Sequence, residues 1–259
     1  NVEIKKNYTH YNAITWDRWA SEENEWSIPI SHEEFLSAKN GEWNVVLTPC
    51  KPVPHSWFPT FSGAKILGLA SGGGQQMPIF RTLGAEVVLF DLSDRQLQSE
   101  RDVAAREQYC IDIVKGDMTK PLPFADQTFD LIFHPVSNSY IEDVQPVWNE
   151  CYRVLKKNGV LLAGLDNGIN FLFDEDEEGT ELKIVHRLPY NPLKDLDESE
   201  LEKMFMKYDG IQFSHTIEEQ VGGQLKAGFS LTDLFEDYND YGELAEFIPT
   251  FVATRAVKK

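Results

Sequence analysis

The stretch that decides the fold is residues 66–78, "ILGLASGGGQQMP", in which three consecutive glycines follow a short apolar run. Glycine at such a place adds no side chain to a core and costs conformational entropy. The backbone at 72–74 must therefore be free of side chains, either for a tight turn or for the close approach of a ligand. The apolar run predicts a buried strand over 64–69, and residues 75–83 predict a helix that ends at Gly84.

The same alternation continues along the chain. Further strands are predicted over 86–91, 111–115, 129–133 and 160–165, and further helices after Ser93 and over about 144–156. Strands that alternate with helices at this spacing form a parallel sheet covered on both faces. Two β-rich runs near the C-terminus, separated by a turn-rich stretch, predict an antiparallel hairpin. We therefore expect an α/β protein with a Rossmann-like, seven-stranded, mostly parallel sheet.

Two segments do not follow this alternation. Residues 1–62 carry five of the six tryptophans and several prolines, which predicts a helical, loop-rich N-terminal arm that acts as a lid. Residues 168–215 predict an inserted cap with a hairpin and a helix near 198–208, and the acidic run 174–178 within it is expected to face solvent. The core then consists of 63–167 and 216–259.

Composition restricts the partners of the protein. The 42 acidic residues outnumber the 24 basic ones, giving a net charge of −18, which argues against nucleic acid as a partner. The three cysteines, Cys50, Cys110 and Cys151, form no CxxC pair, which indicates a reducing compartment without a disulfide framework.

The composition also bears on location and metals. The six histidines show no paired metal-ligand spacing, so no metal site is expected. No basic-then-apolar leader opens the chain and no apolar stretch is long enough to cross a bilayer. These features predict a cytoplasmic protein without a membrane partner, and they give no indication of its oligomeric state.

The glycines can be compared with three kinds of ligand loop. A phosphate-binding loop of the form GxxxxGK[ST] needs a lysine after its last glycine, and Gly73 is followed by Gly74 and Gln75. A dinucleotide loop of the form GxGxxG needs a third glycine where Met77 stands. The phosphate loop is excluded by this comparison, and the dinucleotide loop of a nucleotide-dependent oxidoreductase is disfavoured.

The third kind matches more of the sequence. Over about residues 60–165 the chain resembles the class I S-adenosylmethionine (SAM)-dependent methyltransferases, because "ILGLASGGG" aligns with their first motif and "GDM" with their third. The runs "FDLIF" and "ECYRVLKKNGVLLAG" are also typical of that family, whose type 11 members include an uncharacterised bacterial subgroup with "LASGGGQQ" and "HPVSN". The resemblance implies SAM as cofactor and methyl transfer to an unidentified, small-molecule acceptor.

The resemblance also implies a set of cofactor-binding residues. These are Ala70, Ser71, Gly72 and Gly74 in the loop, Asp91 and Leu92 after the second strand, Asp117 and Met118 after the third, and His134 and Tyr11. Asp91 would accept hydrogen bonds from both ribose hydroxyls, which a carboxylate can do at once. Asp117 would accept from the adenine amino group, and Met118 would frame the ring.

Residues 134–139 follow the fourth strand, where the transferred methyl group is expected. His134 could face the cofactor and is the one, weak, candidate for a catalytic base, because a structural histidine is the commoner outcome at such a position. Ser137 and Asn138 are candidates for contact with the substrate. In the arm, Tyr11 or Trp16 could cover the cofactor, because a sulfonium ion is attracted to aromatic rings.

The chain departs from the family at one informative position. Gly68 stands where the family has an acid that helps to hold the amino group of SAM. Main-chain carbonyls near residues 68–70 and His134 could replace that acid. The absence of the acid at position 68 also leaves open the alternative that the chain is a catalytically silent module, which binds SAM or S-adenosylhomocysteine (SAH) for regulation.

Overall fold

A seven-stranded sheet forms the centre of the protein, in a computed structural model that describes residues 3–175, 181–207 and 210–259. Its strand order is β3-β2-β1-β4-β5-β9-β8. The strands are β1 (Lys65–Leu69), β2 (Glu86–Asp91), β3 (Asp112–Lys115), β4 (Phe129–His134), β5 (Leu155–Asp166), β8 (Ser230–Asp237) and β9 (Phe251–Val257). Neighbours among β1 to β5 pair in parallel, whereas β9 is antiparallel to both β5 and β8, which confirms the expected sheet and C-terminal hairpin.

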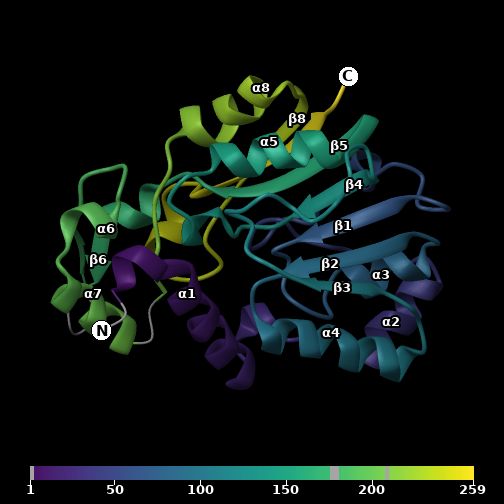
Figure 1. Cartoon of the computed structure of the whole chain (residues 1–259), viewed down its shortest axis with the longest axis horizontal. Coiled ribbons are helices and arrows are strands. Elements are labelled where there is room, and N and C mark those ends of the chain that lie inside the picture. Colours follow the sequence, from purple (N-terminus) through teal and green to yellow (C-terminus); the bar gives the residue numbers. More distant parts are fainter. Residues whose placement is uncertain (1–2, 176–180, 208–209) are drawn as a thin grey trace.

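Helices cover both faces of this sheet. One face packs its buried side chains, such as Leu67 and Leu69, against the helix that carries the fully buried Trp148. Alternate positions such as Ile66 point to the other face, as the two-residue period of a strand requires. The first face is covered by α5 (Gln145–Val154) and α8 (Gly223–Ala227), the second by α2 (His32–Lys39), α3 (Met77–Thr82) and α4 (Asp94–Glu107) (Figure 1).

One helix end needs correction. The helix predicted over about 144–156 ends at Val154, because the fully buried Leu155 already pairs with Phe129 on β4. The helix predicted after Ser93 is confirmed, and Ser93 caps it by accepting a hydrogen bond from the backbone N–H of Gln96. The Gln96 side chain does not return a hydrogen bond to this cap, because it has no hydrogen-bond partner among the described residues.

The arm and the cap contain the remaining elements. The arm has helix α1 (Ile4–Ser21) and two 3-10 turns, η1 (Glu25–Ser27) and η2 (His55–Trp57). The segment from 168 to 215 has η4 (Ile169–Leu172), the hairpin strands β6 (Phe173–Glu175) and β7 (Leu182–Ile184), and helices α6 (Pro192–Asp195) and α7 (Glu198–Met206). The other short turns are η3 (Asn138–Tyr140), the π-turn η5 (Glu218–Gly222) and η6 (Glu243–Glu246). Most of the acidic run 174–178 lies outside the described residues.

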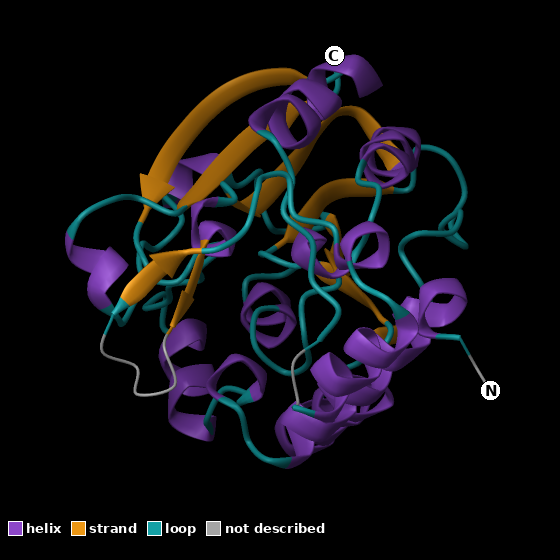
Figure 2. Ribbon diagram, turned by 90° about the vertical axis from the view of Figure 1, so that its left-hand side faces the viewer, coloured by secondary structure: helices purple, strands orange, loops and turns teal. Residues whose placement is uncertain are grey.

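The arm lies where the parallel strands end. β1, β2 and β4 point towards α1 and the cap (Figure 1), and Figure 2 looks onto that edge, with the hairpin and several helices in the lower half of the view. Asn12 of α1 links core and cap, since its side chain donates to the carbonyls of Tyr140 and Ile211, both at 3.0 Å. In the described part of the chain, no helix has the length and apolar character needed to cross a membrane.

Another arm segment is held against the strand ends by one carboxylate. Asp237, at the end of β8, accepts hydrogen bonds at 2.8 Å from the Thr48 hydroxyl and from the backbone N–H groups of Cys50 and Lys51. These contacts hold the pKa of Asp237 below its usual range, even though burial opposes this. The loop that contains Thr48 is thereby fixed over the sheet edge.

Candidate active site

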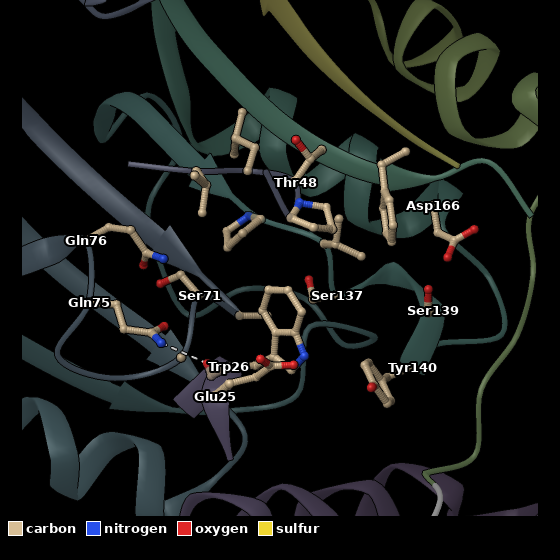
Figure 3. A pocket seen from close by; sticks show the side chains of 18 of the residues that line it. Glu25, Trp26, Thr48, Ser71, Gln75, Gln76, Ser137, Ser139, Tyr140 and Asp166 are labelled. Carbon is tan, nitrogen blue, oxygen red and sulfur yellow. Dashed lines mark hydrogen bonds between the residues drawn. The ribbon is translucent and has the colours of Figure 1, made fainter. Parts of the chain in front are cut away.

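A cavity of about 1370 Å³ opens at the carboxyl edge of the sheet. Ligands of open α/β sheets bind at this edge, because the loops that follow the parallel strands meet there. The wall combines the glycine loop, the ends of β2 and β5, the arm, and the loops after β3, β4, β5 and β8. Figure 3 shows Ser71, Gln75 and Gln76 on one side of this cavity and Asp166, Ser139 and Tyr140 on the other.

The glycine loop contributes only part of what the sequence predicts. Ala70, Ser71 and Gly72 line the cavity, and Gly72 has a φ of +78°, a conformation that favours glycine. Gly74 does not line the cavity, because its N–H donates to the buried carboxylate of Glu100. Gly74 thus holds the loop onto α4 in this structure.

The residues after β2 and β3 lie where the sequence predicts them. Asp91 lines the cavity and accepts hydrogen bonds from the N–H of Ser93 at 2.9 Å and of Gly72 at 3.3 Å. Burial raises the pKa of Asp91 to about 6, despite these donors. Leu92, Asp117 and Met118 line the same part of the wall. Asp117 is oriented by the N–H and the hydroxyl of Thr119, at 2.9 and 2.7 Å.

His134 and Asn138 do not lie at the cavity wall. The His134 ring is fully buried, with Nδ1 at 2.8 Å from the Leu69 carbonyl and Nε2 at 2.8 Å from the Asn138 side chain. Burial lowers the pKa of His134. Both ring nitrogens are therefore occupied by structural contacts, and the reading as a buried structural histidine fits this geometry. Ser137 does line the cavity.

The arm closes the cavity with residues other than Tyr11. Tyr11 packs edge-on against Phe205 in a cluster between α1 and the cap, away from the cavity wall, whereas Trp16 and Trp26 line it. The arm also contacts the glycine loop directly, because Gln75 Nε2 donates to the Trp26 carbonyl at 2.8 Å. Of the two arm residues expected to cover the cofactor, Trp16 therefore lies at the cavity wall and Tyr11 does not.

Two buried polar side chains at the wall lack partners. The Ser71 hydroxyl and both amide atoms of Gln96 have no hydrogen-bond partner among the described residues, although the side chains are 3% and 1% exposed. Buried polar atoms are almost always satisfied, so each of these needs an explanation. Both residues line the cavity beside Gly72, where a ligand with donors and acceptors would satisfy them.

The same region bears on the missing acid at Gly68. A Cβ atom at position 68 would lie 2.5 Å from Ser71 Oγ and 2.9 Å from Met77 Cε, so a family-type carboxylate would require these two side chains to move. The expected main-chain replacement is also weakened, because the Leu69 carbonyl already contacts His134. Ser71 and Gln96 are the groups that could take over the task.

Sequence reasoning missed Gln96 and Asp166. Asp166 ends β5, lines the cavity, and accepts hydrogen bonds from the Gly168 N–H at 2.7 Å and Asn170 Nδ2 at 3.4 Å. Burial raises the pKa of Asp166 to about 6. Its position directly after the apolar run "VLLAGL" was the available signal, since acids at the ends of parallel strands face the ligand edge.

Glu100, which holds the glycine loop, should make the stability of the protein depend on pH. Burial raises its pKa to about 7, although the Gly74 N–H and the Tyr109 hydroxyl both donate to it. Because the folded pKa exceeds the unfolded value of 4.5, stability should fall as pH rises from about 4.5 to 7. Glu100→Gln keeps a side-chain oxygen that accepts a hydrogen bond but cannot ionise. In this variant the fall of about 3 kcal/mol in the free energy of unfolding over this pH range should be absent.

Urea unfolding at several pH values measures this effect. The matched control is Asp102→Asn, an exposed acid on the same helix, which should keep the wild-type slope of stability against pH. A Glu100→Gln protein with the wild-type slope would contradict the prediction, because it would show that burial does not raise the pKa of Glu100 in the folded protein.

Comparisons with known proteins agree with this geometry. Residues 67–163 match the family described as "Methyltransferase domain". The chain is 41% identical to the uncharacterized methyltransferase YbaJ of Bacillus subtilis, over 96% of this chain and 97% of that protein. It is 36% identical to the ubiquinone/menaquinone biosynthesis C-methyltransferase UbiE of Cereibacter sphaeroides, over 41% of this chain and 44% of that protein. The solved structure of a SAM-dependent methyltransferase from Mesorhizobium loti has the same fold, with a TM-score of 0.62, 22% identity, and coverage of 78% of this chain and 94% of that one.

Proposed function

This chain belongs to the family of SAM-dependent methyltransferases, and we propose that it transfers the methyl group of SAM to a small organic molecule. The observation that carries the proposal is the cavity at the strand ends. One side of it has the unpartnered polar atoms of Ser71 and Gln96, and the other side has the carboxylate of Asp166. Neither a silent binding module nor an oxidoreductase is favoured by the family.

The residues present suit the parts of SAM. Asp91 has lone pairs left for the ribose hydroxyls, and Asp117 can accept from the adenine amino group. The Gln96 amide can both accept from an ammonium group and donate to a carboxylate, and the Ser71 hydroxyl can do the same. When bound, SAM supplies an activated methyl group. The protein aligns the acceptor with it and excludes water, for which the arm with Trp16 and Trp26 is suited.

Titration calorimetry with SAH and with NADH tests this proposal. We expect SAH to bind and NADH not to bind, because Met77 is buried where a dinucleotide loop has its third glycine. Binding of NADH in preference to SAH would overturn the proposed function. Transfer of a labelled methyl group from SAM to any compound of a small-molecule panel would exclude a silent module.

Gln96 offers a sharper test of the cofactor site. Gln96→Leu should weaken SAH binding about three- to tenfold, the contribution of one hydrogen bond. The same change should raise the free energy of unfolding of the free protein by about 1–3 kcal/mol, because it removes an unsatisfied buried amide. If Gln96 binds the ligand, Gln96→Leu therefore lowers the affinity for SAH and raises the stability of the free protein.

The control for this variant is Gln98→Leu on the exposed side of α4, where the side chain donates a hydrogen bond to Asp102 of the same helix, at 2.9 Å. It should leave SAH affinity unchanged. If Gln96→Leu lowered stability and left SAH affinity intact, Gln96 would be a structural residue and its assignment to the cofactor would be wrong.

A further inference from the structure

The charge of the cavity wall is of one sign. Among the described residues that line the cavity, nine are acidic and none is Lys, Arg or His, although the chain has 24 Lys and Arg residues and 6 His residues. The acids are Glu25, Glu33, Glu34, Glu42, Asp91, Asp117, Asp166, Asp240 and Glu243. Such a wall raises the local concentration of cations and repels anions.

Three of these acids lie inside the cavity and six at its exposed rim. Asp91 and Asp117 belong to the part assigned to the cofactor. Asp166 lies apart from them, because β2 and β5 are separated by β1 and β4 in the sheet. Three inter-strand spacings put the ends of β2 and β5 about 14 Å apart. Asp166 is therefore placed for the acceptor.

The described residues around Asp166 include no cation that pairs with it. The groups that donate to Asp166 are neutral, a backbone N–H and an amide, and no ion pair of the described residues includes it. A partly buried carboxylate is costly unless a positive charge accompanies it. Aromatic side chains line the same cavity, among them Tyr140, Phe171, Phe173 and Tyr241. Aromatic faces together with a carboxylate are the surroundings that favour an ammonium ion on an apolar body.

We propose that the methyl acceptor is an amine, a small molecule with a basic nitrogen on an apolar or aromatic body, whose nitrogen binds at Asp166. This inference rests on the proposed methyl transfer and adds the acceptor class to it. Phosphate esters and carboxylates are disfavoured as acceptors, because no cationic side chain of the described wall could pair with them.

The chemistry of the transfer agrees with this choice. An acceptor that binds as its ammonium ion first gives one proton to water and becomes the neutral amine. The lone pair of this amine then forms the new N–C bond as the C–S bond breaks. The electron pair of the C–S bond stays on sulfur, so the products are neutral SAH and a methylated ammonium ion. The positive charge thus moves from sulfur to nitrogen during the reaction. A carboxylate fixed beside that nitrogen stabilises the charge as it develops.

Three probes with one body and different head groups test the proposal. Binding of 2-phenylethylamine, 2-phenylethanol and 3-phenylpropionate to the SAH-saturated protein is measured by calorimetry. We expect the amine to bind at least about tenfold more tightly than the alcohol, and the propionate more weakly than either. Asp166→Asn, whose side-chain oxygen can still accept from the Gly168 N–H, should bring the amine to within about threefold of the alcohol. Asp112→Asn, which removes an exposed acid at the start of β3, should keep the amine preference.

The possible outcomes are distinct. Absence of amine binding, equal binding of the propionate, or a full amine preference in Asp166→Asn would each overturn the amine proposal. The SAH titration on the same samples separates these results from a failure of the proposed function. If SAH binds normally and the amine does not, the cofactor assignment stands and the acceptor class is wrong.

Discussion

Asp91→Ala is expected to weaken SAH binding by about 1.5–3 kcal/mol, the usual contribution of hydrogen bonds to a charged group. This corresponds to a loss of affinity of about 10- to 160-fold. The side chain lies at the end of β2 in the cavity wall, with two backbone donors on one side and the open cavity on the other. Calorimetric titration of the folded variant with SAH measures the effect.

Two further variants separate ligand contact from loop support. Asp91→Asn keeps an oxygen for the Ser93 N–H and should show a smaller loss than Asp91→Ala. The control Asp94→Ala removes an exposed carboxylate three residues away that pairs with Lys115 at 2.7 Å, and it should leave SAH affinity unchanged. Because burial raises the pKa of Asp91 to about 6, wild-type affinity should also fall as pH drops through that value. Undiminished binding by folded Asp91→Ala would refute the ribose role.

The strands of the core are readable from the sequence for a simple reason. Buried parallel strands are short, continuous apolar runs, so "KILGL" and "EVVLFD" can be recognised without knowledge of the rest of the chain. The residue that follows such a run must lie at the ligand edge of the sheet. Asp91 could therefore be placed at the cavity correctly, and Asp166 could have been placed by the same rule.

The directions of single side chains and N–H groups could not be predicted in this way. Gly74 has the sequence context of a cofactor residue, but its N–H is taken by Glu100, 26 residues further along the chain. His134 is the last residue of β4, but contacts from Leu69 and Asn138 hold its ring inside the core. Tyr11 and Trp16 lie on one helix, and only the packing of α1 decides which of them reaches the cavity. Each outcome depends on tertiary partners that local sequence does not contain.

The consecutive glycines that make the loop recognisable have different tasks in the structure. Gly72 borders the cavity, whereas Gly74 binds α4 through Glu100. Gly73 is the point of closest approach between the loop and that helix. A Cβ at Gly73 would lie 1.8 Å from the carbonyl oxygen of Gln96 and 2.6 Å from its carbonyl carbon. These are backbone atoms of the first turn of α4, so they cannot rotate away as a side chain could.

Gly73→Ala adds only one methyl group, but it should disturb the cofactor site strongly. Its φ lies outside the left-handed range, so the backbone itself would accept alanine and the close approach alone is tested. The loop or the start of α4 must shift, which should lower the free energy of unfolding by about 1–3 kcal/mol. The shift also separates Gly72 from Asp91 and moves Gln96, so SAH affinity should fall by more than about tenfold.

Gly222→Ala is the matched control for this prediction. Its Cβ would have Glu218 Cγ at 3.6 Å as its nearest neighbour, and alanine in a helix is favoured over glycine by about 0.5–1 kcal/mol. Thermal unfolding with and without excess SAH compares the proteins, since a ligand at 100 times its Kd adds about 2.7 kcal/mol of stability. Wild type and Gly222→Ala should gain this stabilisation, and Gly73→Ala should lose about half of it or more, because a tenfold higher Kd leaves about 1.4 kcal/mol at the same SAH concentration. An unchanged gain in Gly73→Ala would mean that the contact between loop and α4 does not shape the cofactor site, and that the bare backbone at Gly73 serves the fold alone.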